Sequence, residues 1–227
     1  MKRFLLAALL ALAAPGAWAQ AGAAVSPAPD PTAVWESAFN AFALADRQHA
    51  PLPGGVVFVG SSSIRLWNDL EQQFQATPAV IKRGFGGSTL SDCVHYLDRL
   101  VIPYRPRLVL VYAGDNDLAE GRTPGEVLQQ FQSFAQGVHR ALPDTRVAFI
   151  SVKPSPAREA ILPEVRVTNE LVRRYTSSEP GLDFIDIFTP MMGADGHPRP
   201  ELFRADRLHL NRAGYALWRA AISPHVR

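Results

Sequence analysis

Five short apolar runs alternate with amphipathic helical patterns, and this alternation limits the possible folds more than any other feature of the chain. Apolar residues at helical spacing recur over 90–101, 127–138, 165–175 and from about Asn211 onward. Apolar strands that alternate with amphipathic helices are typical of a parallel sheet covered on both faces. The sequence therefore predicts an α/β fold, a three-layer α/β/α flavodoxin-like sandwich with a five-stranded parallel sheet. The runs lie at 56–59, 80–83, 108–112, 146–150 and 182–187.

The first nineteen residues have the three-part pattern of a secretory signal peptide. Met1-Lys2-Arg3 is basic, residues 4–14 form an uncharged run rich in Leu and Ala, and Ala17-Trp18-Ala19 places small residues before Gln20. The apolar run is short for a membrane span, and an uncleaved anchor is the alternative. We therefore predict cleavage near Ala19 and an exported protein, which in a bacterium means periplasmic or secreted.

The remaining chain divides into a tether and one domain. Residues 20–31 are rich in Ala, Gly and Pro, a composition typical of flexible linkers. Asp30-Pro31 resembles a helix start, with Asp as N-cap and Pro at the first helical position. The length of 227 residues suits one domain with a packed core, which we place at 32–227.

Charge and cysteine content exclude several classes of protein. The formal net charge is +2, and Lys2 and Arg3 account for that excess, so the chain after residue 19 is formally neutral. A nucleic-acid-binding protein would normally show a basic excess. The single cysteine excludes an intramolecular disulfide framework and a thiolate-rich metal site. We expect no nucleic-acid partner, no stable membrane insertion and no cofactor or metal; the oligomeric state is not indicated.

Glycine and polar residues follow the first three predicted strands, at the edge where parallel α/β sheets carry function. Gly60-Ser61-Ser62-Ser63 follows the first, Gly84-Phe85-Gly86-Gly87-Ser88-Thr89 the second and Gly114-Asp115-Asn116-Asp117 the third. An exposed serine, glycine amides and an Asn side chain suit nucleophilic attack and oxyanion binding. The serines could instead cap a helix, the Gly segment could be a tight turn, and Asn and Asp are common in turns. A dinucleotide-binding loop matches weakly, because Thr89 occupies the position of its last glycine.

Asp206 and His209 form a further candidate pair near the end of the chain. At this spacing in a turn, the carboxylate can hold one imidazole nitrogen and leave the other for a serine. A surface salt bridge is the alternative, whereas a metal site would need a third ligand that the sequence does not supply nearby.

Taken in order, these motifs resemble those of the SGNH (GDSL) hydrolase family over essentially the whole predicted domain. The Gly-Asp-Ser block of the family resembles Gly60-Ser61-Ser62, and its second-block glycine resembles Gly87. Its Gly-x-Asn-Asp block is matched at 114–117, its Asp-x-x-His block at 206–209, and the residues that follow, 210–215, are also similar. The resemblance implies the SGNH hydrolase fold.

The resemblance implies a catalytic triad of Ser62, His209 and Asp206. The backbone amides of Ser62 and Gly87 and the side chain of Asn116 would form the oxyanion hole. Ser61 replaces the usual aspartate, which removes a charge from this loop and leaves Ser63 as an alternative nucleophile. The Gly-x-Ser spacing favours Ser62.

The implied function is a serine esterase that acts on small acyl esters through an acyl-enzyme. Related proteins act on simple esters, lysophospholipids, thioesters and acetyl groups of polysaccharides, so a lysophospholipase or carbohydrate esterase subtype is open. The connections between predicted elements look short, which predicts no lid, an open site and small acyl groups. Because of Ser61, a non-catalytic glycan- or lipid-binding module on the same fold is the alternative.

Several other residues receive structural interpretations. Cys93 shares an apolar helix side with Leu90 and Leu97, so we expect it to be buried. Trp67 is expected to pack the first helix after the serines. We expect Asp115 and Asp117 to stabilise loops, and the basic loop 153–158 after the fourth strand to be solvated.

Overall fold

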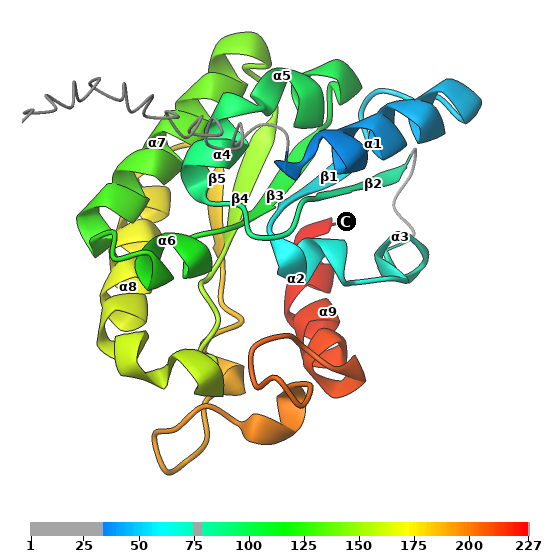
Figure 1. Cartoon of the computed structure of the whole chain (residues 1–227). Coiled ribbons are helices and arrows are strands. Elements are labelled where there is room, and N and C mark those ends of the chain that lie inside the picture. Colours follow the sequence, from blue (N-terminus) through cyan, green and yellow to red (C-terminus); the bar gives the residue numbers. More distant parts are fainter. Residues whose placement is uncertain (1–33, 75–78, 227) are drawn as a thin grey trace, which may run out of the picture. The chain divides into compact units, whose positions relative to one another are not determined.

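All five predicted strands form, and they pair in one parallel sheet (Figure 1). This computed structural model describes residues 34–74 and 79–226. The order is β2-β1-β3-β4-β5, which is the flavodoxin-like doubly wound order. The predicted fold class is therefore confirmed, although the last strand ends before residue 187. The strands are β1 (Val56–Gly60), β2 (Val80–Gly84), β3 (Leu108–Tyr112), β4 (Arg146–Ile150) and β5 (Leu182–Ile185).

The N-terminal predictions lie outside the described residues. The chain divides into two units, Met1–Val34 and Trp35–Arg227, and the description below concerns the second. The predicted signal peptide at 1–19, the tether at 20–31 and the Asp30-Pro31 helix start all precede it. The first helix, α1, spans Glu36–Gln48. Across the described ranges, 34–74 and 79–226, no helix is long and apolar enough to cross a membrane.

Helices connect successive strands, and local capping signals define several of their starts. The Thr123 side chain accepts the Glu126 N–H, and Pro124 occupies the first turn of α7. Thr89 and Asp92 cap α4 in the same way. The helices after α1 are α2 (Ser62–Arg65), α3 (Leu70–Gln73), α4 (Leu90–His95), α5 (Leu97–Leu100), α6 (Asp115–Ala119), α7 (Pro124–Ala141), α8 (Leu162–Ser178) and α9 (Arg212–Val226).

One predicted helix and one predicted connection differ from the structure. The pattern at 90–101 forms two short helices, because the chain leaves helical geometry at Tyr96 (φ −101°, ψ 18°). The segment 186–211 between β5 and α9 is a long connection with two 3₁₀ turns, not a short one. It folds back on itself through isolated bridges, Met192 with Pro198 and Phe203 with Leu210. Apolar periodicity does not report such irregular structure.

Alternate residues of each strand enter two separate apolar cores, one on each face of the sheet. Val57 and Val59 pack into the core that includes residues of α1, α4, α5, α7 and α8. Val56 and Phe58 pack into the opposite core, with α2, α9 and the indole rings of Trp67 and Trp218. Burial on both faces explains why the strands are continuous apolar runs. The fold is therefore the three-layer sandwich seen in Figure 1.

Gly60 allows the end of β1 to lie directly against β3. Its φ is +138°, and a Cβ atom there would lie 1.9 Å from the carbonyl oxygen of Tyr112. No other residue type fits this approach, since all others carry a Cβ. The Ser61 N–H then donates to that same carbonyl, at 3.1 Å, and the chain turns into α2.

Candidate active site

Ser62 begins α2, immediately beyond the carboxyl end of β1. The N-cap of this helix is Ser61, whose side chain makes no capping hydrogen bond, and the Ser62 hydroxyl lies 3.0 Å from Nε2 of His209. The adjacent Ser63 is buried, and its carbonyl accepts the hydroxyl of Tyr215 at 2.9 Å. Of the two serines that the sequence left open, Ser62 is therefore the one that faces the imidazole.

A tight turn at 206–209 brings Asp206 and His209 together. Asp206 Oδ2 lies 2.8 Å from Nδ1 of His209. Its other oxygen accepts the backbone N–H groups of Leu208 and His209, at 3.0 and 2.9 Å. Arg207 adopts the left-handed conformation, with φ +57°, which closes the turn. The predicted three residues therefore form one hydrogen-bonded series from Asp206 through His209 to Ser62.

Hydrogen-bond donors, not burial, set the charge state of Asp206. Its side chain is 47% exposed. The backbone N–H of His209, the His209 side chain and the backbone N–H of Leu208 hold the pKa of this carboxyl well below its usual range. Asp206 therefore stays ionised and keeps its hydrogen bond to the imidazole.

Asn116 follows β3, and Gly87 follows β2. Asn116 is in α6, and its Nδ2 donates to the carbonyl of Ser88 at 2.9 Å. Gly87 is exposed with φ +81°, and a Cβ atom there would meet no atom within 4 Å. The bond to Ser88 joins the two loops and places Asn116 beside the glycine segment.

Asp117 also joins the same two loops. Its carboxylate accepts the Gly114 N–H at 3.0 Å and the Leu90 N–H at 3.1 Å. Burial raises the pKa of Asp117 from 3.8 to about 6, although these N–H donors act in the opposite direction. The expected loop-stabilising role of Asp117 agrees with these contacts.

The prediction that the basic loop after β4 is solvated is wrong. Lys153 is 2% exposed and forms an ion pair with Asp115, which also pairs with Arg158. Although burial alone would raise it, the charges of Lys153 and Arg158 lower the pKa of Asp115 below its usual value. Arg158 also donates to Oδ1 of Asn116 at 3.0 Å. The only sequence signal for this cluster was the basic content of 153–158, because its acidic partner belongs to another loop.

The remaining residues singled out in the sequence have structural positions. Cys93 is buried, as expected, and burial raises the pKa of its thiol. Trp67 is buried and stacks on Tyr215, with ring centroids 4.9 Å apart. In the described part of the chain, no group of three or more His, Cys, Asp or Glu side chains is arranged to hold a metal ion.

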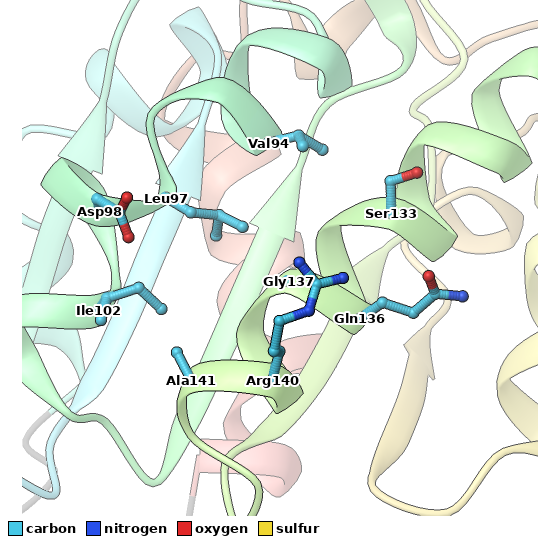
Figure 2. A pocket seen from close by; sticks show the side chains of 9 residues that line it. All are labelled: Val94, Leu97, Asp98, Ile102, Ser133, Gln136, Gly137, Arg140 and Ala141. Atoms are coloured by element: carbon cyan, nitrogen blue, oxygen red, sulfur yellow. The ribbon is translucent and has the colours of Figure 1, made fainter.

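A hollow between α4, α5 and α7 lies apart from these residues (Figure 2). Leu97 packs directly over Gly137 there, because a Cβ atom at Gly137 would lie 2.5 Å from a Leu97 methyl carbon. Asp98 and Arg140 also line it, but none of the predicted site residues does. This hollow is therefore a surface groove where packed helices meet.

In this chain a serine, an imidazole and a carboxylate lie in series at the carboxyl edge of a parallel α/β sheet. This arrangement is found in hydrolases that use a serine nucleophile. A sequence model of the GDSL-like Lipase/Acylhydrolase family matches residues 55–217. This chain belongs to that family. The match includes every residue of the candidate site, from Ser62 to His209.

Individual relatives agree with this assignment. The GDSL esterase/lipase WDL1 of Oryza sativa subsp. japonica is 26% identical, over 73% of this chain and 75% of the rice protein. A GDSL-like lipase from Bacteroides thetaiotaomicron has the same fold, with a TM-score of 0.69 and 23% identity over 83% of this chain and 96% of its own. A catalytic mutant of an acetylxylan esterase from Geobacillus stearothermophilus has a TM-score of 0.62 and 14% identity, over 78% and 96%.

The raised pKa of Asp117 predicts how stability changes with pH. Between pH 3.8 and about 6 the folded state binds more protons at this residue than the unfolded state does, so its contribution to stability falls as pH rises. Asp117→Asn cannot titrate. The free energy of unfolding of the wild type, relative to this variant, should therefore fall by on the order of 2 kcal/mol from pH 4 to pH 7 in urea titrations.

The exposed Asp98 supplies the control for this comparison. Asp98→Asn should stay within about 0.5 kcal/mol of the wild type over the same pH range, because surface substitutions rarely change stability by more than that. A constant difference between wild type and Asp117→Asn would show that Asp117 is not perturbed.

Proposed function

We propose that this protein is a serine esterase that hydrolyses small acyl esters, acetyl or short-chain. The observation that carries the proposal is the hydrogen-bonded series from Asp206 through His209 to Ser62, with contacts of 2.8 and 3.0 Å. Membership of the GDSL-like family supports ester hydrolysis as the reaction class.

The proposed mechanism is acyl transfer in two steps. Ser62 Oγ attacks the ester carbonyl carbon while Nε2 of His209 takes its proton, and Asp206 stabilises the imidazolium. The tetrahedral intermediate collapses, and His209 returns the proton to the departing alcohol. A water molecule then attacks the acyl-enzyme with the same base and releases the acid.

The oxyanion of each intermediate needs donors that are already in place. We assign this role to the backbone N–H groups of Ser62 and Gly87 and to Nδ2 of Asn116. Their support is positional: Ser62 opens α2, Gly87 lies on an unobstructed turn, and Asn116 is bonded to the neighbouring Ser88. Two loops joined by Asp117 would hold these donors rigid.

The small-acyl proposal rests on the openness of the site and on structural relatives. The Asp206 side chain is 47% exposed and that of His209 25% exposed, so the reacting groups lie near the surface. Proteins with the same fold include the acetylxylan esterase above and an acetyl esterase with a TM-score of 0.58. Reacting groups this near the surface leave little enclosing apolar surface for a long acyl chain.

We also propose that residues 1–19 direct export and that 32–227 act as one hydrolase domain behind the tether at 20–31. The support is the basic, apolar and small-residue pattern that ends at Ala19. Expression of the full chain in a bacterium should yield periplasmic or secreted protein, and N-terminal sequencing should then begin at Gln20. A cell-retained protein that begins at Met1 would contradict export.

Ser62→Ala should abolish the hydrolysis of p-nitrophenyl acetate and labelling by a fluorophosphonate probe, because no other hydroxyl faces His209 in the described residues. Ser63→Ala is the matched control, since Ser63 is buried beside it, and this variant should still be labelled. Full activity in Ser62→Ala would overturn the assignment. A wild type that is neither active nor labelled would favour the non-catalytic binding module.

The substrate preference can be measured with p-nitrophenyl esters of increasing chain length, beside acetylated xylan and a lysophospholipid. We expect kcat/KM to be highest for acetyl to butyryl esters and to fall with longer chains. A rate that rises toward long acyl chains, or a preference for the lysophospholipid, would contradict the small-acyl proposal.

A further inference from the structure

A buried charged cluster lies directly beside Asn116 and outside the series of Ser62, His209 and Asp206. Asp115 is buried and forms ion pairs with both Lys153 and Arg158. The cluster holds two basic side chains and one carboxylate, and burial lowers the pKa of Lys153 although Asp115 acts in the opposite direction. Burying charges is costly unless their partners are well placed, and here each charge meets a partner of opposite sign.

The hydrogen bonds of Asn116 fix the orientation of its amide. Arg158 can only donate, so the atom that it meets at 3.0 Å must be Oδ1. The Ser88 carbonyl can only accept, so the atom that it meets at 2.9 Å must be Nδ2. Both contacts would be lost if the amide were flipped. The second N–H of Nδ2 meets no acceptor within residues 34–74 and 79–226, and it is the donor available for an oxyanion.

Arg158 is itself held in place from two sides. One of its terminal nitrogens pairs with Asp115, while the other donates to Asn116. Its loop is also tied to the turn at 206–209, because the Ala157 N–H donates to the Arg207 carbonyl at 3.0 Å. The planar guanidinium fork can make both side-chain bonds at once, which an ammonium group cannot do with the same geometry.

We propose that Arg158, anchored by Asp115, is a positioning residue that orients and polarises the Asn116 side chain for oxyanion binding. The inference rests on the proposed esterase function and adds a residue to that site. A cation bonded to Oδ1 draws electron density from the amide nitrogen, so its free N–H becomes a stronger donor.

Such a residue acts on the transition state and not on ground-state binding. Removal of Arg158 should therefore lower kcat and leave KM nearly unchanged. Both acylation and deacylation pass through an oxyanion, so kcat reports on the effect whichever step is slower. A merely structural residue would instead lower the amount or stability of folded protein without this split.

A double-mutant cycle with p-nitrophenyl acetate tests the inference. We expect Asn116→Ala to lower kcat about 10²- to 10³-fold, and Arg158→Met to lower it about 10- to 100-fold. If Arg158 acts through Asn116, the double variant should be no slower than Asn116→Ala within about twofold. Arg173→Met is the control, because Arg173 pairs with Glu170 on the exposed surface of α8, and its kcat should equal that of the wild type.

The outcomes separate this inference from the proposed function. A wild type that hydrolyses no ester and resists fluorophosphonate labelling overturns both. An active wild type whose double variant loses the product of the two single losses, or whose Arg158→Met changes only KM, overturns the role of Arg158 alone. If Arg158→Met does not fold, the same cycle with Arg158→Lys applies, since lysine keeps the charge beside Asp115 but cannot bridge to Asn116 with the same fork.

Discussion

The close approach of β1 and β3 at Gly60 is the constraint on which the candidate site depends. A Cβ atom at this position would lie 1.9 Å from the Tyr112 carbonyl oxygen, so the two strands can stay paired to their ends only with glycine there. The chain then turns into α2 and presents Ser62 at the carboxyl edge. Parallel pairing brings the ends of β2 and β3 to the same edge, which is why three separate loops meet around one serine.

Two aspartates of the candidate site are kept ionised by opposite means. Asp206 is exposed and is held by N–H donors of its own turn. Asp115 is buried and is held by the charges of Lys153 and Arg158, which come from the loop after β4. The first arrangement orients an imidazole, and the second orients the amide of Asn116. The site therefore combines a locally encoded turn with a cluster that exists only after the sheet has assembled.

The serine loop is held by contacts with the sheet and with α9. Ser61 is buried, and its N–H donates to the Tyr112 carbonyl. The loop is thus fixed by backbone contacts with β3, by the packing of Trp67 on Tyr215 and by the Tyr215 hydroxyl on the Ser63 carbonyl. These contacts fix the loop that presents Ser62.

The sequence by itself determined the strands, because continuous β-branched runs that end at small residues are typical of strands buried on both faces. It also determined which loops carry polar residues. It could not exclude Ser63, could not predict that 90–101 breaks at Tyr96, and placed Lys153 in solvent, where most lysines lie. Only the tertiary structure decided that Ser62 meets His209 and that Lys153 and Arg158 meet Asp115. Those contacts join residues 147, 38 and 43 positions apart, and no local pattern records a pairing that is created when strands assemble side by side.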